Sequence, residues 1–566
     1  MKAGKCDISQ IFNLSRNLQI PFFQRSYVWG VEQWDRFLED MYYISANNQD
    51  YFLGSVILKQ LPTESSKDDI RTLIDGQQRL TTLNIFFKTL CLLNNEDHLF
   101  TSTFKKRRDK SIILIHNYND INSFNKIVNL TSLEEIGYKN DNILSCYNFF
   151  KNNIDLNKVN FYDLLERITF VGIDLDADEN EQQIFDTINS LGVRLTTAEL
   201  LKNLLFNADE IQLYDDYWKN IFEKDEDTIN YWNTEVGKDK RNFIDVLLYS
   251  YLQIKAQDIT LDVSSSDINS FAIQGNLFNS YKLLMKKYLK GNKSILLQDL
   301  KEYSSIFTSN FDPLIKEKVI GSLPSMDRIN IIAFELDTAV IIPYILFILK
   351  NTQSDCEKIK LFETIETFII RRMIAIQGDV SKTYKGFFTL LINKKIITAE
   401  DFIHVVEHSN DQRISMPNNS DLLGGFLSKK ISNVQSRGIL YLLESKIRDA
   451  SKHATHLHGI EKYSVEHLMP KKWINHWPST TQSEVRNKKI QTFGNLAIIP
   501  MKLNSSLRDS NWATKKSGTN SSKGLIHFAQ GLESLTPYVN EPEWNESIIE
   551  KRAHDLYKHA LTAWKI

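Results

Sequence analysis

The sequence predicts a multidomain α+β protein, and three patterns along the chain support this fold class. Short runs rich in β-branched and aromatic residues, separated by turn residues, mark residues 1–210 as a mixture of strands and helices. Apolar residues at helical spacing, with few turn signals, mark residues 211–410 as a mostly helical connector. A second pair of short apolar runs predicts a further small α+β domain within residues 411–566.

Length and composition limit the classes of protein to consider. The 566 residues suit several domains of about 150 residues each, and the net charge of −2 means that any contact with nucleic acid must come from a local basic patch. Four widely spaced cysteines exclude a disulfide framework. The first ten residues lack the apolar core of a signal peptide, and the longest apolar run, 338–349, is shorter than the roughly 20 residues that span a bilayer. We therefore expect a cytoplasmic protein without a membrane segment.

Three strands and two following helices are expected in the N-terminal part. The strands are the runs 52–58, 71–74 and 168–175, in which β-branched and aromatic residues dominate. A helix should begin at Gln77, because apolar residues then recur at helical spacing. A later helix should begin within 196–199, where a threonine and a glutamate stand at the spacing of a capping box.

An Asp-Gly-Gln-Gln-Arg motif lies where the second strand gives way to the helix. Its glycine permits a tight turn, and the free backbone amides of the first helical turn create a pocket for an anion. Arg79 can bind that anion through two hydrogen bonds, Arg25 can close the pocket from a separate segment, and Asp75 is placed to hold Mg²⁺ or a water. The motif predicts a nucleotide-phosphate site with Gln77 and Gln78 orienting groups around it, and a structural helix cap with a surface ion pair is an equally good interpretation. The candidate residues are Arg25, Asp75, Gly76, Gln77, Gln78, Arg79, Asn189 and Arg194.

A second set of candidate residues lies near the C-terminus. A short apolar strand should end at Glu466 and His467, just before a proline, and residues 494–500 should form its partner strand. Asn504 then falls near the start of a helix that should end around residues 515–516. Two strands and a helix that carry a carboxylate–histidine pair and an asparagine resemble the arrangement of the ββα-metal (HNH) nucleases.

Phosphodiester hydrolysis explains why these residue types occur together. The reaction needs an activated water and a cation that neutralises charge on the phosphate and on the leaving oxygen. Glu466 and Asn504 offer the oxygen ligands that Mg²⁺ or Mn²⁺ prefers, and a neutral His467 can take the proton from water. Asn495 should tie the two strands together and orient the imidazole. Four lysines should face phosphates of DNA: Lys471, Lys472, Lys515 and Lys516.

Local charge in this segment favours a contact with nucleic acid. Residues 461–530 contain eleven Lys or Arg against four Asp or Glu, which is typical of a protein that binds the phosphate backbone. We expect Trp473, Trp477 and Trp512, which lie among the basic residues, to belong to the core rather than to stack on bases. For the three histidines of 453–458, a solvated loop is a better interpretation than a zinc site.

Five segments of the sequence resemble one known family. They are PFFQRSYVW (21–29), DGQQRLTTL (75–83), FDTINSLGVRLTTAELLKN (185–203), VEHLMPKKW (465–473) and FGNLAIIPMKLNSSLRDSNWATKK (493–516). In this order they resemble the GmrSD-type family. Its N-terminal domain is related to the ParB/sulfiredoxin-like fold, and its C-terminal domain is an HNH domain.

The resemblance implies a bacterial anti-phage restriction enzyme. Its N-terminal domain would bind or hydrolyse a nucleoside triphosphate and sense DNA modification, and its C-terminal domain would nick or cleave DNA. Carried onto this chain, residues 75–79 would form the nucleotide or sensing site with help from Arg25, His467 would be the general base, and Asn504 would be a metal ligand. HNH enzymes often have aspartate at the position of Glu466, whose side chain is longer by one methylene.

Together, the residues and the resemblance predict a nucleotide-regulated, Mg²⁺- or Mn²⁺-dependent DNA endonuclease that responds to modified phage DNA. One alternative is an NTP-dependent DNA-binding switch whose nuclease fold is catalytically silent. A second alternative is an RNA-directed HNH nuclease. Cleavage of both DNA strands by a one-metal site would favour the pairing of two copies as a homodimer.

Overall fold

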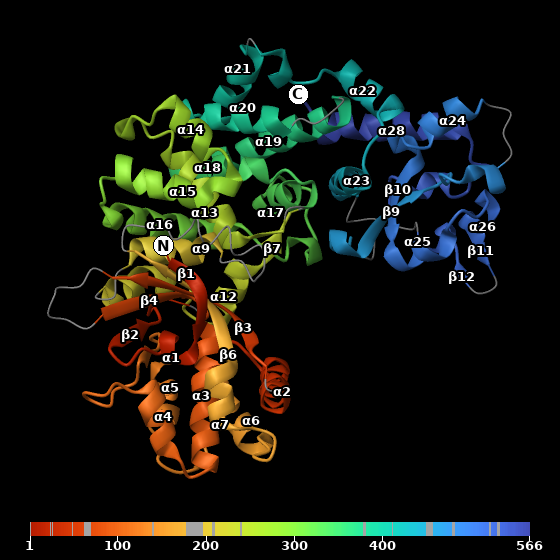
Figure 1. Cartoon of the computed structure of the whole chain (residues 1–566). Coiled ribbons are helices and arrows are strands. Elements are labelled where there is room, and N and C mark those ends of the chain that lie inside the picture. Colours follow the sequence, from red (N-terminus) through yellow and green to blue (C-terminus); the bar gives the residue numbers. More distant parts are fainter. Residues whose placement is uncertain are drawn as a thin grey trace. The chain divides into compact units, whose positions relative to one another are not determined.

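The chain folds into two compact units in the computed structural model, Met1–Asp216 and Tyr217–Ile566. Figure 1 shows the first unit in red to yellow and the second in yellow-green to blue. The structure describes residues 2–22, 24, 26–47, 49–61, 69–137, 141–176, 196–206, 210–237, 240–376, 381–409, 411–448, 457–477, 482–519, 522–528 and 532–566.

A mixed sheet in the order β1-β6-β3-β4-β2-β5 forms the centre of the first unit. Strand β3 runs parallel to β6 and antiparallel to β4, whereas β2 runs parallel to β4 and β5. The three strands predicted from the sequence are confirmed as β3, β4 and β6. The bounds are β1 Lys2–Asp7, β2 Arg16–Gln19, β3 Tyr51–Gln60, β4 Asp69–Asp75, β5 Leu114–Ile115 and β6 Ile168–Leu175.

Helix α3 (Gln77–Leu93) lies at the centre of the apolar core of this unit. It begins at the predicted residue and is buried on nearly all sides, because α4, α5 and α6 pack against it while it shares one core with the sheet. Helix α9 starts with the predicted capping box, in which Thr196 N–H donates to Glu199 Oε2 over 2.8 Å. The helices of this unit are α1 Ile8–Ile11, α2 Val31–Asn47, α3, α4 Asp97–Phe104, α5 Ile121–Val128, α6 Asn142–Asn153, α7 Phe161–Arg167, α9 Thr197–Leu205 and α10 Ile211–Leu213.

The second unit is mostly helical and includes three short antiparallel strand pairs. Its helices are α11 Asn220–Phe222, α12 Glu226–Asn233, α13 Phe243–Lys255, α14 Ser265–Phe271, α15 Leu277–Leu283, α16 Lys293–Asn310, α17 Met326–Asn330, α18 Ile342–Asn351, α19 Asp355–Ala375, α20 Ser381–Asn393, α21 Ala399–Glu407, α22 Asn419–Ser428, α23 Asn433–Ile447, α24 Ser483–Lys489, α25 Met501–Leu507, α26 Trp512–Ser517, α27 Leu525–Phe528 and α28 Glu546–Ala563. Its strands are β7 Glu235–Val236, β8 Arg241–Asn242, β9 Tyr463–His467, β10 Leu496–Pro500, β11 Gly518–Thr519 and β12 Ser522–Lys523.

A buried polar network connects the two halves of the second unit. Arg328 donates two hydrogen bonds of 2.7 Å to the Glu366 carboxylate, which also accepts a 2.8 Å bond from Trp564 Nε1. Burial raises the pKa of Glu366, but the guanidinium of Arg328 outweighs that effect and holds the pKa below its ordinary value. Helix α22 also packs against both α19 and α28. The segments before and after residue 410 thus share one core, and a domain boundary at that residue stays a prediction.

None of the helices in the described part of the chain is both long enough and apolar enough to cross a bilayer. The apolar run 338–349 instead leads into α18, whose first turn contains Pro343. Proline suits that position because the first turn of a helix has no partner for its backbone N–H.

Candidate active site

The predicted strand pair near the C-terminus is present as β9 and β10. The two strands are antiparallel, with His467 opposite Leu496 and Glu466 opposite Ala497. Strand β10 is apolar throughout and buried, which fixes its place under the site, and helix α25 follows it directly. Figure 1 shows β9, β10 and α25 side by side in the blue part of the chain, in agreement with their contacts.

Helix α25 brings Asn504 to the side of β9. The Nδ2 atom of Asn504 donates to Ser464 Oγ over 2.8 Å and to the carbonyl of Val465 over 3.0 Å. Because a backbone carbonyl only accepts hydrogen bonds, this contact fixes which end of the amide faces the strand. Among the described residues, nothing donates a hydrogen bond to the Oδ1 atom of Asn504. That oxygen is therefore open to a further ligand.

Glu466 forms a buried ion pair with Lys515 of α26. The side chain of Lys515 is 0% exposed and that of Glu466 is 7% exposed. The Nζ atom of Lys515 contacts Glu466 Oε1 and donates to the His467 carbonyl over 2.9 Å. Burial raises the pKa of Glu466 and lowers that of Lys515, each in spite of the opposite charge of its partner. The prediction that Lys515 faces phosphates is wrong, because its ammonium group is buried against Glu466.

His467 is the last residue of β9, and it has an unengaged imidazole. Burial, with the nearby charges of Lys471 and Lys515, lowers the pKa of His467 to about 4. The ring is therefore neutral at pH 7, and no other described residue forms a hydrogen bond with either ring nitrogen. Successive side chains of a strand alternate between its faces, so Glu466 shares the face of Ser464 and Asn504, while His467 projects from the other face at the end of the strand.

Asn495 holds the segment that follows His467 rather than the imidazole itself. Its side chain accepts hydrogen bonds from Met469 N–H over 2.8 Å and from Trp544 Nε1 over 3.0 Å. It also donates to the carbonyls of Met469 and Ile490. The prediction that Asn495 ties the strands together fits this geometry, but the prediction that it orients the imidazole does not, because these bonds use its whole amide.

Arg552 of α28 is a supporting residue that the sequence reasoning did not find. It is fully buried and donates to the carbonyls of Phe493, Gly494 and Leu496, at 3.2, 2.9 and 2.8 Å. Burial lowers its pKa to about 10. These bonds fix the start of β10 on both sides of Asn495. The one signal in the sequence is that Arg552 occupies a core position of its helix, three residues after buried Ile549.

The other predicted DNA-facing lysines have different surroundings. Lys471 and Lys472 are exposed, and neither forms an ion pair with any residue that the structure describes. Lys516 is half-buried and donates to the Glu541 carbonyl over 3.3 Å. Trp473, Trp477 and Trp512 are all buried, which confirms that they belong to the core.

The helix expected from Asn504 to residues 515–516 is in fact two helices. Helix α25 ends at Leu507, and α26 begins at Trp512. Arg508 has a φ of 44°, which ends the first helix, and the Asn511 side chain caps the second by accepting from Thr514 N–H over 2.9 Å. This break lets Asn504 and Lys515 both reach β9.

The N-terminal motif forms a strand–turn–helix, as predicted. Gly76 has a φ of 105°, a conformation that favours glycine, and it caps α3 without a side chain. Arg79 Nη2 donates to Asp75 Oδ2 over 2.9 Å and to the Ser55 carbonyl over 2.7 Å. The geometry is that of the helix cap with an ion pair, and nucleotide binding stays a prediction.

The two glutamines of this motif face the protein rather than an open pocket. Gln77 and Gln78 are both buried. Gln78 Oε1 accepts from the backbone N–H groups of Val28 and Trp29, at 2.9 and 3.3 Å. Gln78 thus fixes the preceding segment, and the prediction that it orients groups of a ligand is corrected. The candidate residues Arg25, Asn189 and Arg194 lie outside the described residues, as do two of the three histidines of 453–458.

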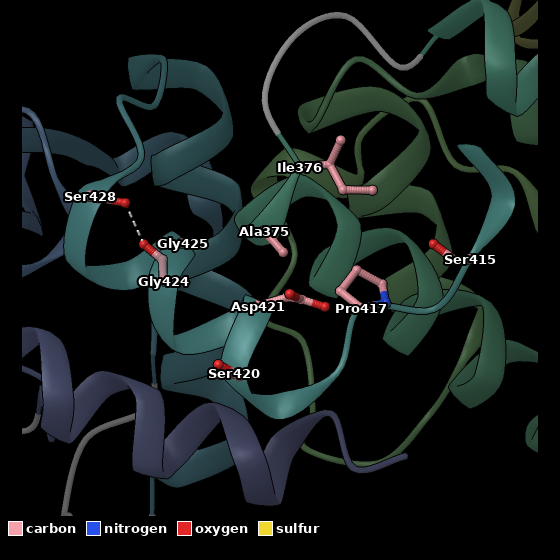
Figure 2. Close-up of a pocket in the computed structure, with 9 residues that line it drawn as sticks. All are labelled: Ala375, Ile376, Ser415, Pro417, Ser420, Asp421, Gly424, Gly425 and Ser428. Atoms are coloured by element: carbon pink, nitrogen blue, oxygen red, sulfur yellow. Dashed lines mark hydrogen bonds between the residues drawn. The ribbon is translucent and has the colours of Figure 1, made fainter. Parts of the chain in front are cut away.

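The structure has a cavity of about 410 Å³ in the second unit. Figure 2 shows that it lies between the end of α19 and helix α22. Its one charged lining residue, Asp421, accepts a 3.0 Å hydrogen bond from Asn418 N–H and so caps α22. No candidate site residue lines this cavity.

No group of three or more His, Cys, Asp or Glu suited to a metal ion occurs within the described ranges.

Two family models match the chain. The N-terminal domain of the GmrSD restriction endonuclease matches residues 8–206, and the C-terminal domain of the GmrSD restriction endonucleases matches residues 416–559. Together they cover more than half of the chain. The first range contains residues 75–79, and the second contains Glu466, His467 and Asn504. No curated protein matches the chain.

Proposed function

We propose an HNH-type catalytic mechanism for this chain, which belongs to the GmrSD family of restriction endonucleases. Membership of that family makes it a restriction-type nuclease with DNA as its substrate. The observation that carries this proposal is that the Glu466 carboxylate and the His467 imidazole are adjacent at the end of β9, and that α25 holds the Asn504 amide against the same strand. Asn504 contacts Val465, which is two residues, or about 7 Å along the strand, from His467.

Two oxygen atoms on one face of β9 fit a hard divalent cation. Oδ1 of Asn504 and Oε2 of Glu466 accept no hydrogen bond from the described residues. Mg²⁺ and Mn²⁺ prefer such oxygen ligands and keep several waters in addition. When bound, the cation would neutralise charge on the scissile phosphate and on the leaving oxygen.

His467 is the general base in this proposal. The ring is neutral at pH 7 and neither nitrogen is bonded by a described residue, so a ring nitrogen can accept a proton from water. The water oxygen forms the new bond to phosphorus, the proton passes to the imidazole, and the bond from phosphorus to the leaving oxygen breaks. The buried pair of Glu466 and Lys515 holds the end of β9 in place during this step, since Lys515 also bonds the His467 carbonyl.

Regulation by a nucleotide is the second part of the proposal. The first turn of α3 presents the positive end of a helix, and Arg79 is partly exposed beside it. A triphosphate would compete with Asp75 for Arg79, which would break the ion pair that closes this turn.

We further propose that the N-terminal domain senses modified phage DNA, as the resemblance to restriction enzymes suggests, and that two copies pair when both strands are cut.

The direct test is a cleavage assay with Mg²⁺ or Mn²⁺ on plain, glucosylated-hydroxymethylcytosine and phosphorothioate DNA, with and without nucleotides. His467→Ala should lower the cleavage rate by about 10³-fold while DNA binding is kept. Asn504→Ala should raise the metal concentration needed for half-maximal rate by about 10-fold or more. Undiminished cleavage by the His467 variant would remove the general base. RNA of equal length, cleaved as fast as DNA, would favour the RNA-directed alternative.

One observation favours the second candidate function, a DNA-binding switch with a silent nuclease fold. Lys515 places a cation against Glu466, where a metal ion would otherwise neutralise the carboxylate. This candidate predicts tight, salt-sensitive DNA binding and no metal-dependent product. The same cleavage assay separates the two candidates.

A further inference from the structure

The turn that follows β9 carries the most exposed large apolar side chain in the described part of the chain. This side chain is Ile474, which is 78% exposed and lies in the short 3₁₀ turn Trp473–Asn475. The turn starts six residues after His467 along the chain.

Hydrogen bonds of two buried tryptophans hold this turn in place. Trp473 Nε1 donates to Asn487 Oδ1 over 2.8 Å, and Trp477 Nε1 donates to the Ser510 carbonyl over 3.1 Å. The guanidinium of Arg486 lies 4.8 Å from the centre of the Trp473 ring and donates to the Trp477 carbonyl over 3.1 Å. Ile474 is therefore presented on a rigid support, so that inserting it into a partner costs little conformational entropy.

Three exposed cations lie on the segments that carry and contact this turn. Lys471, Lys472 and Arg508 are exposed, and none forms an ion pair within the part of the chain that the structure describes. Arg508 belongs to this group because its neighbour Asp509 accepts a 3.3 Å hydrogen bond from Asn475, next to Ile474. That bond, with the charges of His476 and Lys472, holds the pKa of Asp509 below its ordinary value. Ile474 is thus an exposed apolar side chain on a segment that carries Lys471 and Lys472 and that Asn475 joins to the segment of Arg508.

The backbone of Arg508 is a second and independent sign of function. Its φ of 44° and ψ of −134° lie in a region that favours glycine over residues with a side chain. An arginine at a strained position that glycine would relax indicates that the side chain itself is needed. Strain of this kind concentrates at binding sites.

We propose that Ile474 is a wedge that enters duplex DNA and unstacks a base step beside the scissile phosphate. Lys471, Lys472 and Arg508 bind the phosphates on either side of that step. Apolar wedges set among basic residues deform DNA in this way, and the wider contact that follows compensates for the lost stacking. The proposal rests on the DNA endonuclease function proposed above and adds how the substrate is distorted for cleavage.

The first test uses the full chain and a duplex that contains 2-aminopurine, whose fluorescence rises when its base is unstacked. In EDTA, the wild-type protein should raise this fluorescence, and Ile474→Ser should abolish most of the rise. The same variant should bind the duplex about 10-fold more weakly, because one isoleucine is no longer buried. Its affinity for single-stranded DNA should not change, because there is no stack to open. Leu323→Ser is the matched control, since Leu323 is 77% exposed and lies in the same unit, far from β9 in sequence.

The second test separates binding from folding. Arg508→Gly relaxes the backbone, so the melting temperature should stay the same or rise, while affinity for the duplex falls. The slope of log affinity against log salt should decrease by about 1, because one phosphate contact is lost. A variant that keeps the wild-type affinity and slope would overturn the role of Arg508.

The outcomes for the wedge and for the nuclease are distinguishable. Ile474-dependent unstacking without any Mg²⁺- or Mn²⁺-dependent cleavage would support the wedge and remove the endonuclease mechanism. Normal cleavage and normal unstacking by Ile474→Ser would overturn the wedge and leave the nuclease. An equal loss of affinity for an RNA duplex of the same sequence would overturn duplex DNA as the partner.

Discussion

The two candidate sites both place a carboxylate beside a cation at the end of a strand, but they bury the pair to different extents. Arg79 and Asp75 lie 2.9 Å apart with side chains 26% and 35% exposed, whereas Lys515 and Glu466 are almost fully buried. Water screens the first pair, so its cation can exchange one anion for another. Separating the second pair would leave a buried charge, so Lys515 is a fixed part of the fold. A short distance between a cation and a carboxylate therefore does not show whether the cation can bind a ligand or only stabilises the fold; the exposure of the pair is also needed.

His116 and His467 are both neutral, and they differ in whether their ring nitrogens already form hydrogen bonds. The Nδ1 atom of His116 accepts from Asn117 N–H over 3.1 Å, so its Nε2–H donates to Thr81 Oγ1 over 2.9 Å. Thr81, His116 and nearby Asp120 resemble a catalytic triad in composition, but this proton arrangement leaves no base for the threonine. His467 has no such partner among the described residues. Burial makes both rings neutral, and only the free one is suited to catalysis.

The strongest test of the comparison is to remove the buried cation. Lys515→Met should lower the free energy of unfolding of the second unit by about 3–5 kcal/mol, because the Glu466 carboxylate stays buried without a partner. Denaturant unfolding followed by tryptophan fluorescence reports this, since seven of the nine tryptophans lie in that unit. The double variant Glu466→Gln/Lys515→Met should recover much of the loss. A single variant as stable as the wild type would show that the pair is not structural.

A smaller effect is expected from pH in the first unit. Burial lowers the pKa of His116 from 6.5 to about 3, so the unfolded chain takes up a proton first as the pH falls. The stability that the neutral ring contributes is therefore present above pH 6.5 and is lost below it, by about 2 kcal/mol at pH 5. Hydrogen exchange of the α3 amides, corrected for the intrinsic pH dependence of exchange, measures this loss.

The control for this pH effect is His116→Gln, which has no titrating ring and can keep hydrogen bonds to Thr81 and Asn117. Its stability should depend less on pH over this range than that of the wild type. Equal slopes in the two proteins would show that another group is responsible.

The smallest effect is expected from the exposed pair. Arg79→Met should change the stability of the first unit by at most about 1 kcal/mol, because water screens the interaction with Asp75. If Arg79 binds a phosphate, the same change should weaken nucleotide binding by about 10-fold, the effect of one charge-assisted hydrogen bond. Arg16→Met, which removes another partly exposed ion pair of the first unit, with Asp69, is the control and should leave nucleotide binding unchanged. A loss of several kcal/mol would mean that the two ion pairs do not differ.

Much of the local structure could be predicted from the sequence. Strands β3, β4 and β6, the start of α3, the capping box of α9 and the pair β9–β10 follow from side-chain period, turn residues and caps. These signals act over a few residues, so one sequence contains them in full. The break between α25 and α26 was missed, because helical spacing gives no sign of the left-handed Arg508.

From the sequence alone we predict a carboxylate and an imidazole at the end of β9 and an amide in the helix that follows β10. Which of the charged groups stay in water follows from the packing of segments that are distant in sequence. Lys515 reaches Glu466 across 49 residues of chain, and Arg552 reaches Leu496 across 56. The physical reason is that burial depends on every segment packed around a group, whereas a sequence pattern reports only the neighbours along the chain.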